Sequence, residues 1–267
     1  MPERIGCFSF CADGKRIIAG MQSGIAFIDL AEGGIERVFD LQPDNPEIRF
    51  NDGRCDRDGR FWVGGVIETM DRRANGLYRY DPDGTCRLMV DHLICANGLA
   101  FSPDGVLLAT ADRNGGLFVW EAYSGREYLA LKGHGSAITA LSWRSDSNVL
   151  ASCSEDGSVK LWEMENGGQI KNWGAHGGGV ACVEFSRDGR LVTCGRDRVA
   201  KLWDANGKVL RSFDAFQDLA LRTTFCDETN GVIAGDWRGE LRVWDVADGK
   251  LLGQLDTNPP LLSQRVV

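Results

Sequence analysis

Apolar and polar residues alternate along this chain in short runs, and no window shows the spacing of an amphipathic helix. In one stretch the apolar-rich runs are separated by Ser-Asp-Ser, Glu-Asp-Gly and Asn-Gly-Gly, which are residues that favour tight turns. Runs of this length with such breaks predict β-strands joined by hairpin turns. The four runs are Ile138–Trp143, Val149–Cys153, Val159–Glu163 and Ile170–Trp173.

A turn signal recurs every 40 to 46 residues, and a tryptophan recurs on a later strand at a similar spacing. Repeats of this period are typical of four-stranded propeller blades, which cannot bury both faces alone and therefore pack in a ring. The sequence predicts an all-β, six-bladed β-propeller with four-stranded antiparallel blades, forming a single domain over residues 1–267. The expected blades span about 5–43, 46–93, 96–132, 135–173, 177–213 and 217–256. The turn signals are Asp13-Gly14, Asp58-Gly59, Asp104-Gly105, Asp146-Ser147, Asp188-Gly189 and Glu228-Thr229, and the tryptophans are Trp120, Trp162, Trp203 and Trp244.

Composition narrows the class of protein. The 267 residues carry a formal net charge of −8, which opposes binding to a phosphate backbone, so we expect no nucleic-acid partner. No apolar run has the length of a membrane helix, and the beginning of the sequence has no secretory pattern. The nine cysteines lack metal-binding spacing, which is typical of reduced thiols in a cytoplasmic protein. The sequence identifies no partner, and it leaves open a monomer, a dimer paired through sheet edges and the role of residues 257–267.

The second part of the chain resembles WD-repeat propellers. In that family such His, Ser/Thr, Asp and Trp residues form a hydrogen-bonded network within a blade, and we expect this structural role rather than catalysis by His and Asp. In the last blade Phe216, Ala234 and Arg238 replace the His, Ser/Thr and Asp, so we expect that blade to be less tightly fixed. The residues that carry the resemblance are Gly133-His134, Ser152, Asp156 and Leu161-Trp162-Glu163, then Ala175-His176, Thr193, Asp197 and Leu202-Trp203-Asp204, and finally Val243-Trp244-Asp245.

The first part resembles the gluconolactonase, or regucalcin-like, family. Its members are six-bladed propellers that hydrolyse sugar lactones with a divalent cation on the axis. We place the lactonase-like blades at 1–105 and the WD-like blades at 106–267. The residues behind the resemblance are Arg49-Phe50-Asn51-Asp52-Gly53, Asp58-Gly59-Arg60-Phe61-Trp62-Val63-Gly64 and Asn97-Gly98-Leu99-Ala100-Phe101.

By this resemblance Asn97 matches a metal ligand, and Arg49 and Asn51 match substrate-contacting residues. Counting from the turn signals, Asn51 and Asn97 hold equivalent places on the first strand of their blades. The family's ligand Glu and its Asp, which is also the general base, have no counterpart. The equivalent positions in the last three blades are Thr139, Ala181 and Leu221. Without anionic oxygens a Ca²⁺ ion is poorly held, so we expect these residues to be vestigial. Glu68, in a long loop of the second blade, is the one carboxylate that could still support weak metal binding.

Three functions stay open at this point. The first is an artificial recombinant of two propeller families with no evolved catalytic activity. The second is a residual metal-dependent sugar lactone hydrolase, and the third is a WD-type scaffold that binds a protein or peptide. We favour the first and expect no enzyme activity and no cofactor, with weak binding of Ca²⁺ or Zn²⁺ as the alternative.

Overall fold

The computed structural model describes residues 3–41, 47–67, 69, 75–93, 97–226 and 229–256. Within these residues the chain forms six four-stranded antiparallel sheets, which confirms the predicted all-β propeller class and its four-stranded blades. The chain divides into two compact units, Met1–Gly133 and His134–Val267. The prediction that the blades make one closed domain stays a prediction.

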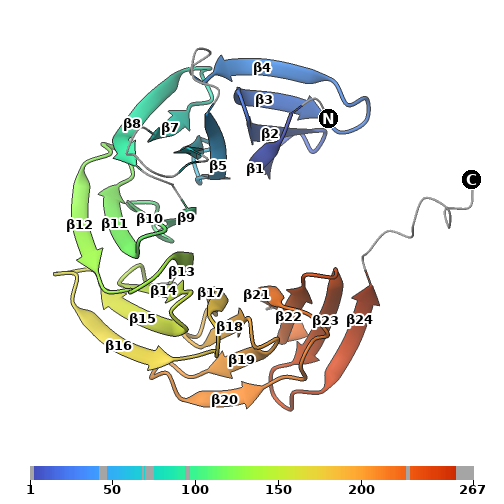
Figure 1. The fold of residues 1–267 in the computed structure, drawn as a ribbon. Coiled ribbons are helices and arrows are strands. Elements are labelled where there is room, and N and C mark those ends of the chain that lie inside the picture. Colours follow the sequence, from blue (N-terminus) through green and yellow to red (C-terminus); the bar gives the residue numbers. More distant parts are fainter. Residues whose placement is uncertain are drawn as a thin grey trace, which may run out of the picture. The chain divides into compact units, whose positions relative to one another are not determined.

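The first unit contains three sheets, and in each the strands follow one another in sequence order (Figure 1). Every pair of neighbouring strands is antiparallel, as hairpin connections require. The strands are β1 (Ile5–Phe10), β2 (Arg16–Met21), β3 (Gly24–Asp29) and β4 (Ile35–Asp40); β5 (Ile48–Cys55), β6 (Phe61–Ile67), β7 (Asn75–Tyr80) and β8 (Cys86–Leu93); and β9 (Asn97–Phe101), β10 (Leu107–Ala111), β11 (Gly116–Glu121) and β12 (Glu127–Lys132).

The second unit repeats this arrangement in three further sheets. Its first sheet has the four strands that the alternation of apolar residues predicts, within one residue at each end. The strands are β13 (Ile138–Trp143), β14 (Val149–Ser154), β15 (Ser158–Glu163) and β16 (Gln169–Gly174); β17 (Val180–Phe185), β18 (Leu191–Gly195), β19 (Ala200–Trp203) and β20 (Val209–Ser212); and β21 (Ala220–Cys226), β22 (Gly231–Asp236), β23 (Glu240–Asp245) and β24 (Leu251–Asp256).

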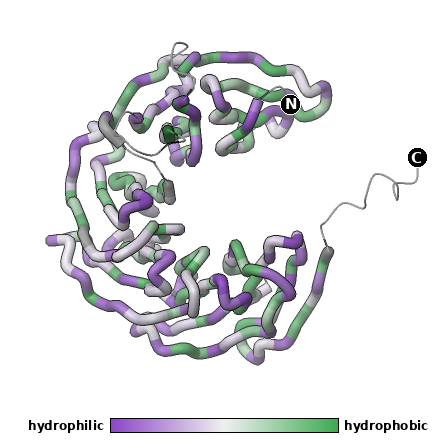
Figure 2. Tube along the Cα trace, in the orientation of Figure 1, coloured by the Kyte–Doolittle hydropathy of each residue, from purple (hydrophilic) through white to green (hydrophobic). Residues whose placement is uncertain are grey.

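The core of each unit lies between consecutive sheets. The second strand of a sheet is the most buried, and every residue of β6, β14 and β18 is buried. The outermost strands β16 and β20 are largely exposed. Hydrophobic stretches interrupted by hydrophilic residues follow each other along the chain (Figure 2), which is the pattern that sheets packed face to face require.

The recurring turn places one residue in the left-handed backbone region, where glycine carries the smallest steric penalty. Gly14, Gly59, Gly105 and Gly189 occupy this position with φ between 65° and 87°. In the fourth sheet Ser147 takes the same place with φ 63°. The turn geometry is therefore kept where the glycine is lost.

The first strand of most sheets carries a bulge at the position that the sequence repeat aligns. The extra residue is Gly6, Asn51, Thr139, Ala181 or Leu221. In β9 the irregularity falls instead beside Gly98, with φ 62°, and Asn97 itself pairs with Ala111. Asn51 and Asn97 therefore differ in their place relative to the bulge, which departs from the equivalence that we expected from their spacing.

Side chains on first strands connect neighbouring sheets through main-chain N–H groups. Ser9 Oγ accepts from Cys55 N at 3.3 Å, and Ser142 Oγ accepts from Phe185 N at 2.9 Å. Both serines lie four residues before the turn aspartate of their own sheet, and each N–H lies three residues before the next turn signal. Two carboxylates do the same: Glu184 Oε1 accepts from Phe225 N at 3.2 Å, and Asp52 Oδ2 accepts from Leu99 N at 3.1 Å.

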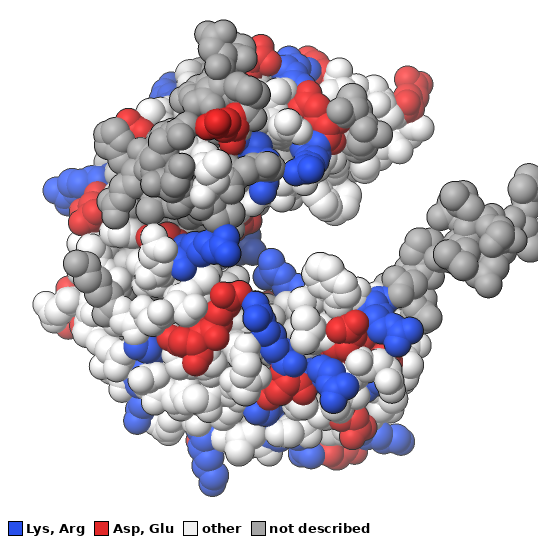
Figure 3. All heavy atoms as spheres, viewed as in Figure 1, with Lys and Arg blue, Asp and Glu red and all other residues white. Residues whose placement is uncertain are grey.

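The described part of the chain holds no helix with the length and apolar character that a bilayer crossing requires. On the face shown in Figure 3, basic and acidic side chains are interspersed. The expectations of a cytoplasmic location, and of no nucleic-acid or membrane partner, stay predictions.

Candidate functional site

The first WD-like network joins two strands of one sheet, β14 and β15, the turn between them and the segment that precedes β13. His134 Nε2 lies 2.8 Å from Ser152 Oγ, and His134 Nδ1 lies 3.1 Å from Asp156 Oδ2. The indole Nε1–H of Trp162 donates to Ser152 Oγ at 2.9 Å. These contacts assign a neutral imidazole: the tryptophan donates to the serine, the serine to Nε2, and Nδ1–H to the aspartate. All four residues predicted for this network are thus in contact.

The next sheet repeats the network with threonine in place of serine. His176 Nε2 lies 2.6 Å from Thr193 Oγ1, and His176 Nδ1 lies 2.8 Å from Asp197 Oδ1. Trp203 Nε1–H donates to Thr193 Oγ1 at 2.8 Å. Lys201 Nζ adds a contact at 3.3 Å to Asp197 Oδ2 and donates to the Ala175 carbonyl at 2.7 Å. The four predicted residues again form one connected set.

A serine, a histidine and an aspartate at these distances have the connectivity of a hydrolytic triad. The burial of the hydroxyl groups decides whether the arrangement is a catalytic triad or a structural network. Ser152 and Thr193 are 0 % exposed, and each hydroxyl oxygen already accepts the indole hydrogen of a buried tryptophan. A substrate carbonyl has no path to either oxygen, so the arrangement favours a structural role over nucleophilic catalysis.

Burial lowers the pKa of both His134 and His176, and the hydrogen bonds and charges of Asp156 and Asp197 offset this only in part. The pKa values of Asp156 and Asp197 are lowered as well. Burial alone would raise the pKa of each aspartate. The hydrogen bonds from Ser158 and His134 outweigh burial and lower the pKa of Asp156. The hydrogen bond from His176 and the charges of His176 and Lys201 lower the pKa of Asp197. The native networks therefore hold neutral histidines and ionised aspartates.

We expect the free energy of unfolding to fall as the pH is lowered from about 7. The unfolded histidines bind protons near pH 6.5, whereas the folded ones bind them at lower pH, so stability is present above that pH and is lost below it, by at most about 1.4 kcal/mol per pH unit for each histidine. Further loss follows below about pH 4, where the aspartates of the unfolded chain are protonated. Urea titrations from pH 7 to pH 5 measure the slope. The double variant His134→Gln/His176→Gln should flatten it, and an unchanged slope would show that the two histidines titrate alike in both states.

The last sheet lacks the network, as the sequence predicts. Trp244 is 0 % exposed, and its Nε1–H has no acceptor among the described residues. Phe213 stacks on it at 4.9 Å between ring centroids, and Phe216 meets it edge to face at 5.8 Å. Ala234 lies ten residues before Trp244, where the other sheets place Ser152 or Thr193. Aromatic packing thus takes the place of hydrogen bonding.

Replacing Trp203 with phenylalanine should therefore destabilise the protein by about 1 kcal/mol more than replacing Trp244, because only Trp203 loses a hydrogen bond. Both substitutions remove the same ring from a buried site, so each serves as the control for the other. Chemical denaturation of the two variants and the wild type supplies the comparison. Equal losses would mean that the indole hydrogen bond adds nothing measurable to stability.

The lactonase-like residues lie on the first strands of the first unit. Arg49 Nη1 donates to Asn51 Oδ1 and to the Phe50 carbonyl, both at 3.3 Å, so the two residues matched to substrate contact are neighbours in space. Asn97 begins β9, and its side chain is outside the described residues. Glu68 also lies outside them. The predicted roles of these four residues stay predictions.

The described residues do not fit the divalent cation that the lactonase resemblance implies. Among them, no three His, Cys, Asp or Glu side chains gather closely enough to hold a metal ion. The guanidinium of Arg49 beside the amide oxygen of Asn51 further opposes a cation at that oxygen. In the second unit the aligned bulge positions hold Thr139, Ala181 and Leu221, which offer no carboxylate.

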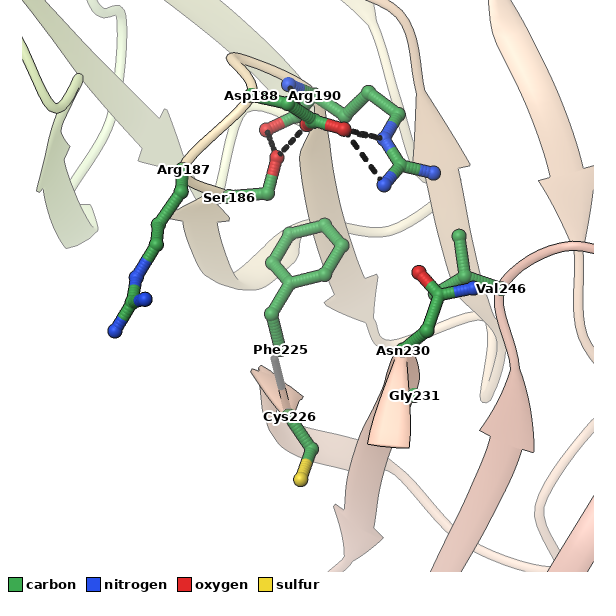
Figure 4. A pocket seen from close by; sticks show the side chains of 9 residues that line it. All are labelled: Ser186, Arg187, Asp188, Arg190, Phe225, Cys226, Asn230, Gly231 and Val246. Atoms are coloured by element: carbon green, nitrogen blue, oxygen red, sulfur yellow. Dashed lines mark hydrogen bonds and ion pairs between the residues drawn. The ribbon is translucent and has the colours of Figure 1, made fainter. Parts of the chain in front are cut away.

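A pocket of about 190 Å³ lies in the second unit beside the turn between β17 and β18 (Figure 4). Its two principal charges neutralise each other, since Arg190 Nη2 lies 2.8 Å from Asp188 Oδ2, and Ser186 donates to the same carboxylate. The ring of Phe225 faces the cavity, and Arg187 extends away from the ion pair. The Asp188 carboxylate accepts from Ser186, but the hydrogen bond from Arg190 lowers the pKa of Asp188, so this carboxylate is a weak base for the serine proton.

Sequence reasoning did not single out the side chains that connect neighbouring sheets: Ser9, Asp52, Ser142 and Glu184. A signal for three of them was present, since Ser9, Ser142 and Glu184 all lie four residues before a turn aspartate. Asp52 stands inside the Arg-Phe-Asn-Asp-Gly motif, but its acceptor role toward β9 becomes visible only in the structure.

Residues 1–128 match the family model of the SMP-30/Gluconolactonase/LRE-like region, and residues 125–163 and 167–204 match the WD domain, G-beta repeat. L-arabinolactonase of Azospirillum brasilense is 39% identical over 108 residues, which is 39% of this chain and 36% of that protein. 6-Deoxy-6-sulfogluconolactonase of Pseudomonas putida is 40% identical over 105 residues, 39% of this chain and 35% of that protein. The chain spans about a third of the length of these curated relatives.

The match to the lactonase-like family continues past residue 105, where we expected the join, and overlaps the WD match at residues 125–128. Trp120 and Glu121, which fall in the range 106–267 that we expected to be WD-like, lie inside the lactonase-like match. The WD match ends at residue 204 and does not include the last sheet, in which the network residues are replaced. The chain is therefore similar to lactonase-type proteins over its first 128 residues and to WD repeats over the segments that follow.

Proposed function

We propose that this chain is an artificial recombinant of two propeller families and has no evolved catalytic activity. The observation that carries the proposal is the change of matched family within residues 125–128, where a lactonase-like region gives way to WD repeats. A lactonase needs ligands from several blades around one axis. Blades of another family do not supply them, as Thr139, Ala181 and Leu221 illustrate.

The chemistry of the described residues supports the same proposal. They include no cluster of three His, Cys, Asp or Glu side chains that could hold an ion to activate water. The two His–Asp pairs that could serve as general bases are used in buried networks. Among the residues that the structure describes, neither part of the chain thus offers the activated nucleophile that lactone hydrolysis requires.

Lactone hydrolysis and thermal unfolding, each measured with and without Ca²⁺, test the proposal. We expect hydrolysis of sugar lactones at the buffer rate and a melting temperature that Ca²⁺ leaves unchanged. Turnover that depends on Ca²⁺ and is lost in Asn97→Ala or Glu68→Gln would establish a residual lactonase instead. Asn51→Ala is the matched control for Asn97→Ala, because the resemblance assigns Asn51 to substrate contact and not to metal binding.

A WD-type binding scaffold is the second candidate, and one exposed residue favours it. Trp237, on the turn between β22 and β23, is 70 % exposed. Its main-chain N–H donates to the carbonyl of Leu219, a residue that is itself 36 % exposed. Large exposed aromatic side chains often anchor protein partners. Selection from a displayed peptide library would reveal such binding, and Trp237→Ala should abolish it. Peptides that bind the variant equally well would exclude this surface.

A further inference from the structure

Two cysteines of the second unit face each other across neighbouring strands. Cys182 of β17 is the register partner of Cys194 of β18. Directly opposite residues of antiparallel strands point to the same face and have Cα atoms about 4.5–5.5 Å apart. That separation falls in the range of about 4.4–6.8 Å that a disulfide spans. The backbone therefore already holds the two thiols at bonding reach.

Cys182 lines a pocket whose lining does not include Cys194. A cavity of about 270 Å³ is lined by Cys182, and Arg222 and Glu184 contribute its charged groups; Cys194 is not part of its lining. Cys182 is 3 % exposed and Cys194 is 0 % exposed. A molecule in this cavity thus meets Cys182 first, and the low exposure restricts access to small reagents.

The surroundings also shift the pKa values of the two thiols in opposite directions. A hydrogen bond from Cys194, opposed by burial and aided by the charge of Arg222, lowers the pKa of Cys182. The same hydrogen bond and burial raise the pKa of Cys194. In the neutral state Cys182 Sγ donates to the Thr223 carbonyl at 3.6 Å. A cysteine of lowered pKa beside a second cysteine is an arrangement found at reactive cysteine sites.

The neighbouring Cys153 shows the contrasting case. It is 0 % exposed, burial raises its pKa, and Thr139 Oγ1 lies 3.2 Å from its sulfur. It has no place in the lining of the cavity. Cys153 is therefore an internal reference for an inert buried thiol.

We propose that Cys182 and Cys194 form a peroxide-reactive thiol pair, with Cys182 as the attacking thiolate and Cys194 as the resolving thiol. The Cys182 sulfur attacks one oxygen of a hydroperoxide, the O–O bond breaks, and the leaving oxygen takes a proton as water or alcohol. Cys182 becomes a sulfenic acid, and the peroxide is reduced by two electrons. The Cys194 sulfur then displaces the hydroxyl group, which leaves with the thiol proton as water, and a Cys182–Cys194 disulfide forms.

Hydrogen peroxide is the probe for the folded full-length chain. Trypsin separates the thiols, because Cys182 falls in residues 172–187, Cys194 in 191–196 and Cys153 in 145–160. After brief peroxide treatment, alkylation and digestion without reduction, mass spectrometry should find residues 172–187 linked to 191–196. Cys182 should lose its reactivity toward the alkylating reagent at least tenfold faster than Cys153.

The variant Cys194→Ser removes the resolving thiol and should leave Cys182 as a sulfenic acid that a 1,3-dione reagent captures. Cys153→Ala is the matched control and should still form the link between residues 182 and 194. The wild-type peptide map does not depend on either variant folding. Oxidation of Cys153 or Cys226 before Cys182, or a wild-type chain in which Cys182 and Cys194 both stay alkylatable, would overturn the proposal.

Discussion

Replacing Thr193 with valine is expected to lower the free energy of unfolding by about 2–4 kcal/mol, although valine has nearly the same shape. The hydroxyl oxygen of Thr193 accepts from Trp203 Nε1, and its hydrogen is directed to His176 Nε2. Removing the hydroxyl leaves two buried polar groups without a partner, and each one costs about 1–3 kcal/mol. Urea denaturation followed by tryptophan fluorescence measures the loss.

A double-variant cycle separates the network from the packing around Thr193. Trp203→Phe removes one of the two orphaned groups in advance, so Thr193→Val should cost less in that background than in the wild type. Costs that simply add would show that Thr193 and Trp203 are energetically independent. A loss of less than about 0.5 kcal/mol for Thr193→Val alone would remove the network from the account of stability.

Gly6→Ala is expected to destabilise the first unit by about 2–3 kcal/mol, as overpacking of a close contact does. A Cβ atom at Gly6 would lie 2.4 Å from the Phe50 carbonyl oxygen and 2.7 Å from that of Asn51. Both atoms belong to the main chain of the next sheet, which cannot rotate away as a flexible side chain can. The midpoint of thermal or urea unfolding reports the effect.

Gly34→Ala is the matched control for Gly6→Ala, because a Cβ at Gly34 meets nothing within 4 Å. That variant should stay within about 0.5 kcal/mol of the wild type. If Gly6→Ala proved equally neutral, the bulges of the first two sheets would have to be less closely packed than the distances indicate.

The sequence was sufficient to predict the strands and the two networks, and the reason is local. Turn chemistry and alternation repeat every 40 to 46 residues, so the pattern that locates β13, β14, β15 and β16 within one residue recurs along the chain. The network residues recur at constant spacing, as with Trp162 and Trp203, each ten residues after its hydroxyl partner. Family resemblance supplied their roles, and the geometry places them in contact.

The partners that first-strand side chains contact in the next sheet were beyond what the sequence could predict, although the position of three of these side chains before the turn recurs. Ser142 and Phe185 are 43 residues apart, and a polar residue in an alternating strand is equally compatible with a solvent-facing position. The facing of Cys182 and Cys194 depends on the bulge at Ala181, because one residue more or less reverses the side of the sheet. The shift of the irregularity from Asn97 to Gly98 is another such detail, set by backbone conformation and not by hydropathy.

The hydrogen bonds that connect first strands have a consequence for how such blades can be exchanged. The accepting side chain belongs to one blade, whereas the next contributes only a main-chain N–H, which every residue except proline possesses. This connection therefore places almost no demand on the receiving blade's sequence. It occurs at Ser9 in the lactonase-like region and at Ser142 in the WD repeats alike. A blade grafted from another lineage should dock in the same way, provided that the blade before it keeps a serine or glutamate four residues ahead of its turn.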